Sequence, residues 1–323
     1  MTDNHRLGRL LIKDASFGKL KYSFNLTEST GEFDIRATLE MTISSDGNNV
    51  QNLSAEEYRT RIREVFNYLH VQYGILADYE SVRLRRLEIN ATFALNEPYE
   101  RYRYPILMMM RNVPPKRFSS DKNEVVKYAT WAASDMAAQT DRLETALVKN
   151  SSIELKIYHK SKWLRDQGFE SDDGRDLMRV EYTLKDARLL ERYFADNMVS
   201  SLSDDQIRTM FQDYFKRDVI ERFKSWHDEN IRQLADMIEK HRKTEVHWVG
   251  YFLRECRQYA EIHGLPILFS LEDVKEAMRL LEPCGGKNLA NKYKRFLRQA
   301  FYEKDLSGNT RRMKEIFGKI MRM

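Results

Sequence analysis

The chain has 323 residues, of which 42% are hydrophobic, 32% are charged and only 6 are proline, and this balance excludes a disordered or fibrous protein. Its length predicts two domains of ordinary size. The sequence contains no stretch of about 18 uninterrupted apolar residues and no apolar signal region at its start, so we expect a cytoplasmic protein with no membrane partner. Cys256 and Cys284 do not form a C-x-x-C pair, which excludes a disulfide framework or a zinc site built on paired cysteines.

The first half of the chain alternates apolar and polar residues in the way that β-strands do. Residues 18–26 and 32–44 follow this pattern around a Glu-Ser-Thr-Gly turn, which predicts a hairpin. Ser54 and Glu57 predict a capping box for a helix that ends at Gly74. Further strands are expected at residues 81–95, as a central strand, and at 153–160 and 177–185. Residues 103–113 are expected to form another strand or the approach to one, and weaker candidates lie around Val125 and at 143–149.

From about Asp186 onward, the apolar residues recur at helical spacing. This change of period predicts a domain boundary near residues 196–202. We therefore predict an α+β protein with an N-terminal, mainly antiparallel sheet domain flanked by helices, followed by an all-helical C-terminal region. The sheet domain is expected to span residues 1–198 and to carry any chemistry, and residues 199–323 are expected to form a DNA-binding or accessory region.

The last 40 residues carry a strong positive charge. Residues 284–323 contain 11 Lys and Arg against 3 Asp and Glu, a local charge of +8, and aromatic residues are interleaved with the cations. Such a surface favours nucleic acid as a partner, because neutralising phosphates releases their counterions. A solvated helical face fits the same composition. The candidate DNA-binding residues of this tail are Lys287, Lys292, Lys294, Arg295 and Arg298.

Three of the predicted strands place polar residues on one face. The two-residue period puts Glu88 together with Asn90, and Glu181 together with Arg179, opposite the apolar residues of their strands. If these strands are neighbours, two carboxylates meet on one surface. A hard divalent cation such as Mg²⁺ takes oxygen ligands of this kind and would offset their repulsion.

Tyr158 and Lys160 add a hydroxyl and a cation to the same predicted surface. Each residue also has an ordinary interpretation, since tyrosine is a favoured strand residue and a strand glutamate commonly pairs with a neighbouring arginine. His159 alternates with Tyr158, so it is expected to point to the other face as a surface histidine. His241 and His247 are six residues apart, which matches no metal-binding spacing on a helix.

Several common site motifs are absent from the sequence. It contains no G-x-x-x-x-G-K-[ST], no G-x-G-x-x-G, no G-x-S-x-G and no H-x-H pair. The first two motifs bind nucleotide phosphates, so nucleotide hydrolysis is not expected.

Three segments, LRRLEINATFAL, ELKIYHKSKWL and MRVEYTLKDARLLE, follow one another at residues 84–95, 154–164 and 178–191. In this order and spacing they resemble the replication initiator family of filamentous phages and related plasmids, the gene II/X proteins. Members of that family carry an R-[IL]-D strand, a K-[IL]-Y-[DE]-K strand and an R-x-E-x-x-L-K strand in succession. The likeness covers about residues 55–195.

The resemblance implies a protein that nicks and rejoins one DNA strand at a phage or plasmid origin through a tyrosine–phosphodiester intermediate, which starts rolling-circle replication. Tyr158 would be the nucleophile, and Lys160 would offset charge on the phosphate. Glu88 and Glu181 would hold Mg²⁺ or Mn²⁺. Origin DNA, single- or double-stranded, would be the main partner, with host helicase and polymerase as further partners and a homodimer as an alternative use of the helical region. The sheet-domain residues expected to bind DNA are Arg86 and Arg179.

This chain departs from the family pattern at two positions. Glu88 stands where the family usually has Asp, and His159 stands where it has an acid. The role of His159 is left open, including that of a further metal ligand. Tyr182, Tyr193 and Tyr214 are alternative nucleophiles. Two rival functions also fit the sequence: a non-catalytic DNA-binding regulator and a relaxase for conjugative mobilisation.

Overall fold

The structure is a computed structural model, and the residues that it describes form two compact units. The described residues are 12–14, 20–29, 32–40, 50, 52–74, 76, 78–111, 143–169, 174–244, 248–263, 269–281, 291 and 308–323. The first unit takes residues 1–84 and 194–206, and the second takes 85–193 and 207–323. Each unit is therefore built from two separate stretches of chain. The functional division at residue 198 stays a prediction.

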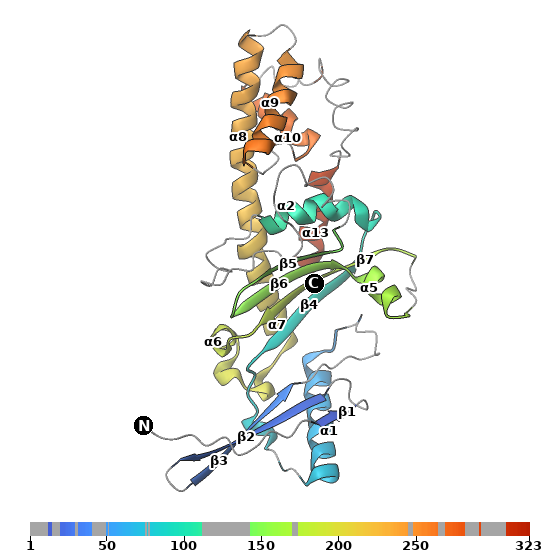
Figure 1. Cartoon of the computed structure of the whole chain (residues 1–323), viewed down its shortest axis with the longest axis vertical. Coiled ribbons are helices and arrows are strands. Elements are labelled where there is room, and N and C mark those ends of the chain that lie inside the picture. Colours follow the sequence, from blue (N-terminus) through green and yellow to red (C-terminus); the bar gives the residue numbers. More distant parts are fainter. Residues whose placement is uncertain are drawn as a thin grey trace. The chain divides into compact units, whose positions relative to one another are not determined.

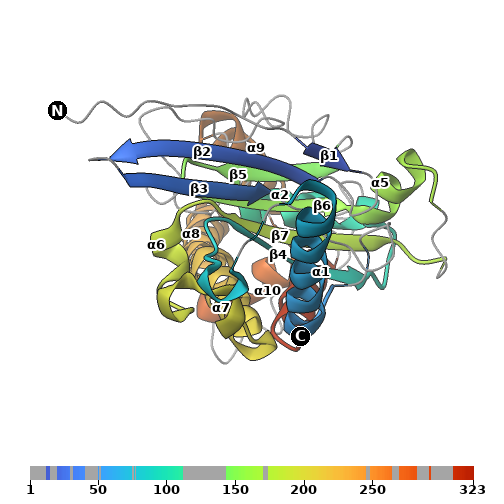
Figure 2. The same cartoon turned by 90° about the horizontal axis from the view of Figure 1, so that it is seen from below.

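The first unit contains a small antiparallel sheet. Its strands are β1 (Ile12–Asp14), β2 (Leu20–Ser29) and β3 (Glu32–Glu40), and they pair in the order β1-β2-β3. Strands β2 and β3 lie side by side with Phe24 opposite Ala37, which confirms the predicted hairpin (Figure 2).

Helix α1 (Ala55–Tyr73) follows the sheet in the first unit and is fixed at both ends by local chemistry. The Ser54 hydroxyl accepts a hydrogen bond from the Glu57 backbone N–H at 3.2 Å, and the Glu57 carboxylate accepts one from the Ser54 backbone N–H at 2.8 Å. This is the predicted capping box. Gly74 ends the helix with φ 68°, a left-handed conformation that glycine adopts without steric cost.

The second unit contains the sheet on which the predicted site residues lie. Its strands are β4 (Leu87–Ala94), β5 (Thr145–Lys149), β6 (Ile153–His159) and β7 (Leu177–Leu184). They are antiparallel neighbours in the order β4-β7-β6-β5 (Figure 1). The prediction that residues 81–95 form a central strand is wrong for the sheet that the described residues form, because β4 lies at one edge of it and pairs with β7. Burial alternates along β4 and is nearly continuous along β7, which fits an edge position for β4 and a position for β7 between β4 and β6.

A second prediction is wrong at residues 103–111, which belong to the segment 103–113 where a strand or the approach to one was expected. The structure places helix α2 (Arg103–Arg111) there, directly after the 3₁₀ turn η2 (Tyr99–Tyr102). Pro105 lies in the first turn of α2, where the missing N–H has no helical partner to lose. Residues 106–110 are all buried, so their apolar run hides the helical period that would have identified the helix. The weak strand candidate around Val125 lies outside the described residues.

After β7, every element among the described residues is helical, which confirms the predicted α+β class. The longer helices are α7 (Asp204–Phe215), α8 (Glu221–Thr244), α9 (Trp248–His263), α10 (Leu271–Leu281) and α13 (Asn309–Ile320), with a π-helical turn η6 (Lys216–Ile220) between α7 and α8 and the short α6 (Ala187–Leu190) before them. Helix α7 packs on the apolar face of the sheet, where the Tyr182 ring lies edge-on to Phe211 at 5.8 Å.

Helices α8, α9 and α10 share a core of their own within the second unit (Figure 1). His227 of α8 binds Asp273 of α10, with 2.9 Å between Nε2 and Oδ1. Burial would lower the pKa of His227, but the hydrogen bond to Asp273 and the negative charges of Asp273, Glu276 and Asp228 raise it overall. The pair therefore favours a protonated imidazole between the two helices.

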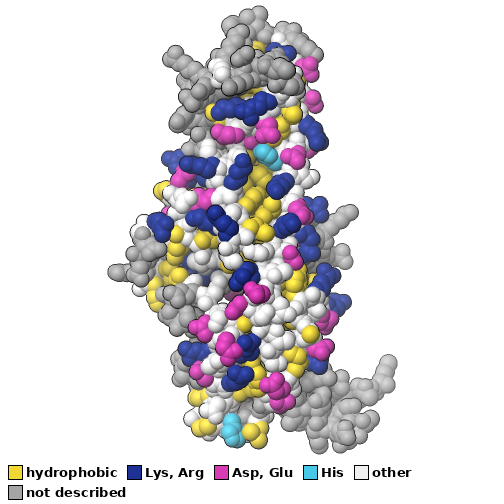
Figure 3. Space-filling view, turned by 180° about the vertical axis from the view of Figure 1, so that it is seen from behind, with side chains coloured by type: hydrophobic (Ala, Val, Ile, Leu, Met, Phe, Trp, Pro, Cys, Tyr) yellow, Lys and Arg dark blue, Asp and Glu magenta, His cyan; other side chains and the backbone are white. Residues whose placement is uncertain are grey.

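Charged side chains of both signs are interspersed on the face shown in Figure 3, where Lys and Arg alternate with Asp and Glu. This distribution matches the small net charge of +5. None of the described helices combines the length and the apolar character that a membrane span requires.

Candidate active site

The strand register gives the four-stranded sheet one polar and one apolar face. Asn90 and Lys156 both lie opposite Glu181, and Tyr158 lies opposite Arg179, so these side chains share one face with Glu88. The residues between them, such as Ile89, Tyr182 and Ile157, occupy the other face and are buried. The strand register therefore confirms the prediction that Glu88, Glu181 and Tyr158 lie on one surface.

Tyr158 lies near the end of β6 and is only 7% exposed. Its hydroxyl donates a long hydrogen bond of 3.5 Å to Oε2 of Glu181. Burial and the charge of Glu181 raise the pKa of Tyr158 above its usual value of 10.0, although Arg179, which hydrogen-bonds to the phenol, lowers it in part. The phenol is therefore held protonated at neutral pH, next to a carboxylate that can accept its proton.

Lys156 is the cation that contacts both Tyr158 and Glu181. Its ammonium lies 3.1 Å from Oε1 of Glu181 and 4.6 Å from the centroid of the Tyr158 ring. Lys160, the predicted cation, begins helix α5 (Lys160–Asp166) and lies 3.7 Å over the ring of Trp163. Sequence reasoning missed Lys156, although the two-residue period from Tyr158 would have placed it on the polar face.

Glu88 and Glu181 come close enough to interact, although they are on different strands. Partial burial and the negative charge of Glu181 raise the pKa of Glu88, while Lys156 and Arg86 lower it. Glu88 keeps an exposed surface at the edge strand, whereas Glu181 is 6% exposed. One carboxylate of the pair therefore faces solvent, and the other is enclosed beside the phenol.

The donor set fits a hard divalent cation. Two carboxylates on one surface, with the amide of Asn90 opposite Glu181, supply oxygen atoms of the kind that Mg²⁺ and Mn²⁺ prefer. Magnesium commonly uses one or two carboxylates and completes its shell with water and substrate phosphate. Within the described part of the chain, no group of three or more His, Cys, Asp or Glu is arranged to hold a metal. Any cation here would therefore depend on the substrate for part of its coordination.

The predicted DNA-binding residues differ in their exposure and in whether the structure describes them. Arg179 is fully buried in the sheet and donates to the Thr92 hydroxyl at 2.7 Å, so it belongs to the surroundings of Tyr158 rather than to an outer surface. Arg86 is exposed just before β4. The tail residues Lys287, Lys292, Lys294, Arg295 and Arg298 lie outside the described residues.

His159 points away from this site, as the alternation predicts, but it is not a surface residue. Its side chain is 4% exposed, with Nδ1 3.1 Å from Oε2 of Glu144 and Nε2 3.0 Å from Oδ1 of Asp176. The expectation of an exposed histidine is therefore wrong, because two carboxylates from distant parts of the sequence compensate its burial. Its place on the opposite face also separates it from Glu88 and Glu181 as a metal ligand.

The alternative tyrosines lie apart from the two glutamates. Tyr182 and Tyr214 are fully buried on the helix-covered face of the sheet, with ring centroids 5.7 Å apart and ring planes tilted by 42°. Tyr193 lies 6.0 Å from Tyr214, and its hydroxyl donates to Asp213 at 3.4 Å. These three residues form an aromatic core, so Tyr158 is the candidate tyrosine that meets Glu181 on the polar face.

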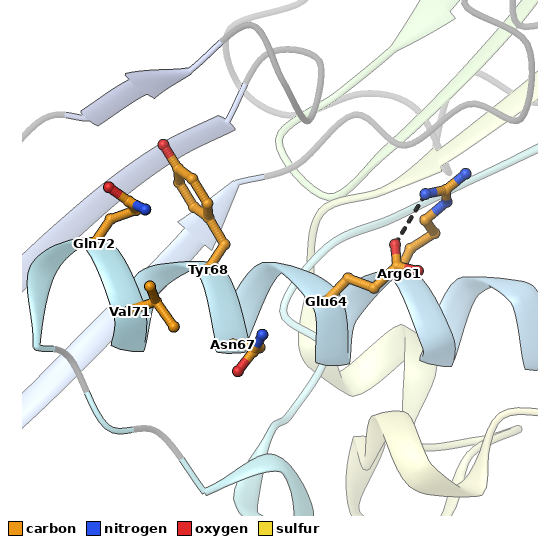
Figure 4. Close-up of a pocket in the computed structure, with 6 residues that line it drawn as sticks. All are labelled: Arg61, Glu64, Asn67, Tyr68, Val71 and Gln72. Atoms are coloured by element: carbon orange, nitrogen blue, oxygen red, sulfur yellow. Dashed lines mark hydrogen bonds and ion pairs between the residues drawn. The ribbon is translucent and has the colours of Figure 1, made fainter.

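A hollow in the first unit lies along α1 and is separate from these residues (Figure 4). An ion pair of 2.9 Å between Arg61 and Glu64 closes one end of the group of side chains that line it. The lining residues are Arg61, Glu64, Asn67, Tyr68, Val71 and Gln72. None of them was a predicted site residue.

Comparison of this chain with protein-family models, with curated proteins and with solved structures finds no match. The resemblance to the initiator family therefore depends on the three sequence motifs alone.

Proposed function

We propose that the protein is a metal-dependent DNA nickase and strand transferase, which starts rolling-circle replication by forming a covalent bond between Tyr158 and a DNA 5′-phosphate. One observation carries this proposal. A tyrosine hydroxyl, a carboxylate that accepts its hydrogen bond and two cations lie together on one sheet face, where the three family-like motifs place them.

Each group has a role in the chemistry. The phenolic oxygen of Tyr158 forms a bond to phosphorus as the bond from phosphorus to the 3′-oxygen breaks. The phenolic proton passes to Oε2 of Glu181, and the departing 3′-oxygen takes a proton from solvent. The reverse attack by a 3′-hydroxyl releases the tyrosine and rejoins the strand, so the phosphodiester bond energy is retained.

Charge compensation is the main requirement of this reaction, because negative charge builds up on the phosphate. Arg179 hydrogen-bonds to the phenol and Lys156 lies over its ring, which supports a role for both cations in offsetting this charge. Glu88 and Glu181 would hold a divalent cation, which would supply further positive charge to the phosphate. Such a cation would compete with Lys156 for the carboxylate of Glu181.

The proposal is tested with supercoiled DNA of the genetic element that encodes the protein, incubated with Mg²⁺ or Mn²⁺. The wild-type protein is expected to convert it to nicked circles and to remain covalently attached. Tyr158→Phe removes the nucleophile and should abolish both products, whereas Tyr182→Phe removes a hydroxyl from the opposite face and should leave both intact. Undiminished nicking by Tyr158→Phe would contradict the assignment.

Glu88→Gln and Glu181→Gln should each raise the metal concentration needed for nicking. Full activity of both variants at low metal would remove the carboxylates from the mechanism. Strongly salt-dependent DNA binding without any covalent product, at any metal concentration, would instead support a non-catalytic regulator. Nicking of a transfer origin but not a replication origin would support a relaxase.

A further inference from the structure

A polar cluster centred on the buried His159 fixes the end of β6, on the sheet face opposite to the Tyr158 side chain. The imidazole stacks on the ring of Tyr99 at 4.3 Å with an interplanar angle of 6°, and its two nitrogens contact the carboxylates of Glu144 and Asp176. Glu144 directly precedes β5, and Asp176 directly precedes β7. One side chain therefore joins the end of β6 to the beginnings of both neighbouring strands.

The imidazole of His159 is the enclosed member of this cluster. Its side chain is 4% exposed, whereas those of Glu144 and Asp176 are 31% and 22% exposed. Arg103 of α2 supplies a cation that pairs with Glu144. Burial would raise the pKa of Asp176, but hydrogen bonds from the Tyr99 backbone N–H and from His159 lower it overall.

Backbone contacts tie the same point of the sheet. The His159 N–H donates to the Glu144 carbonyl at 3.0 Å, and the Tyr99 N–H donates to Oδ2 of Asp176 at 2.9 Å. Two residues after His159, the hydroxyl of Ser161 accepts a hydrogen bond from the Leu177 N–H at 2.7 Å. Tyr158 lies directly beside this tethered point, with its side chain on the opposite face.

We propose that His159 is a positioning residue for Tyr158, which it holds in line with Glu181 by fastening the end of β6 to β5 and β7. This inference rests on the proposed function, because the position of the phenol matters for catalysis only if Tyr158 is the nucleophile. Rotation of the strand end would move the phenol away from a carboxylate that it already reaches only at 3.5 Å. Nucleophilic attack needs close alignment of the reacting atoms, so a small displacement has a large effect on rate.

The test is His159→Gln in the full-length protein, which keeps one hydrogen bond but no longer bridges the two carboxylates. We expect the rate of covalent adduct formation at saturating DNA to fall by about 100-fold, the loss that a displacement of about 1 Å can cause, while DNA affinity changes less than twofold. His227→Gln is the matched control. It removes the imidazole of another histidine–carboxylate pair, between α8 and α10, and should leave adduct formation unchanged.

A readout independent of DNA cleavage is the ¹⁹F NMR signal of 3-fluorotyrosine placed at position 158. His159→Gln should shift or broaden this signal at a temperature well below unfolding, and His227→Gln should not. Adding Glu144→Gln and Asp176→Asn to His159→Gln replaces the two carboxylates by neutral amides. The triple variant should return the ¹⁹F signal and the rate of adduct formation part of the way to the wild-type values.

The two proposals fail in different ways. If the wild type forms no adduct but the ¹⁹F signal still depends on His159, the nicking proposal fails, whereas the inference that His159 positions the Tyr158 side chain is supported. An unchanged ¹⁹F signal in His159→Gln, or a loss of DNA binding equal to the loss of rate, would overturn the positioning role.

Discussion

Replacing Lys156 by Met tests how the carboxylates of the site are compensated. Methionine keeps the apolar stem that packs on the Tyr158 ring but removes the ammonium that lies 3.1 Å from Glu181. Glu181 is then left with the repulsion of Glu88 and without its contact cation. We expect the metal-free variant to be less stable than the wild type and to bind Mn²⁺ more tightly.

The magnitude follows from the geometry of the pair. Two unit charges 3.1 Å apart interact by about 5 kcal/mol at an effective dielectric constant of about 20, and by about 1 kcal/mol in water. The Lys156 side chain is 31% exposed and that of Glu181 is 7% exposed, which places the pair between these limits. A loss of about 2 kcal/mol in unfolding free energy is therefore expected. If Mn²⁺ replaces the ammonium, its affinity should rise by roughly 30-fold, the same free energy expressed as a binding ratio.

The assay combines urea unfolding, with and without Mn²⁺, and isothermal titration calorimetry of Mn²⁺ binding. Lys185→Met is the matched control, because Lys185 is 27% exposed, close to the 31% of Lys156, and makes its 2.9 Å ion pair with Glu154 rather than with Glu181. The control should lose stability equally in both conditions, whereas Mn²⁺ should restore the stability of Lys156→Met. Equal Mn²⁺ affinity in the wild type and in Lys156→Met would refute the view that the lysine and the metal share Glu181.

Three further predictions concern the fold. The raised pKa of His227 stabilises the native state fully below the unfolded value of about 6.5, and this contribution is lost as the pH rises through the native value. The difference in unfolding free energy between wild type and His227→Gln should therefore shrink as urea unfolding is repeated at increasing pH above about 6.5. Ser54→Ala removes the capping box of α1 and should cost about 1 kcal/mol in the same experiment, with an unchanged denaturant slope. Arg312 of α13 is 5% exposed and binds Glu97 with 2.7 Å and 3.1 Å contacts, so Arg312→Met should lower the unfolding free energy by roughly 3 kcal/mol; a loss below about 0.5 kcal/mol would show that the pair contributes no more than a surface ion pair.

The polar face of the site could be predicted from the sequence, because side chains alternate strictly along a strand. This period predicts that Glu88 and Glu181 each lie opposite the apolar residues of their own strand, so that they share a surface if the strands are neighbours. The register brings both of them and Tyr158 to one face. The edge position of β4 could not be predicted in this way. It depends on which strands pair, and alternation within one segment carries no information about its neighbours.

The position of Lys156 and the burial of His159 were missed for physical reasons. Strand β6 ends at His159 and α5 begins at Lys160, so Lys160 lies beyond the strand, whereas Lys156 lies within it on the same face as Tyr158. The role of Lys160 stays a prediction. The burial of His159 depends on Glu144 and Asp176, which lie 15 and 17 residues away and reach it only when the strands pair. Isolated motifs describe a side chain and its immediate neighbours, whereas such compensation is a property of the folded sheet.

The most direct test of the central claim is mass spectrometry of the protein trapped on DNA of its own genetic element in the presence of Mn²⁺. Trypsin cleaves after Lys156 and Lys160, so Tyr158 is the only tyrosine in the peptide of residues 157–160. Our account predicts a nucleotide attached through its 5′-phosphate to that peptide. A nucleotide on a peptide that contains Tyr182, Tyr193 or Tyr214, or no adduct under conditions where the DNA is nicked, would contradict it.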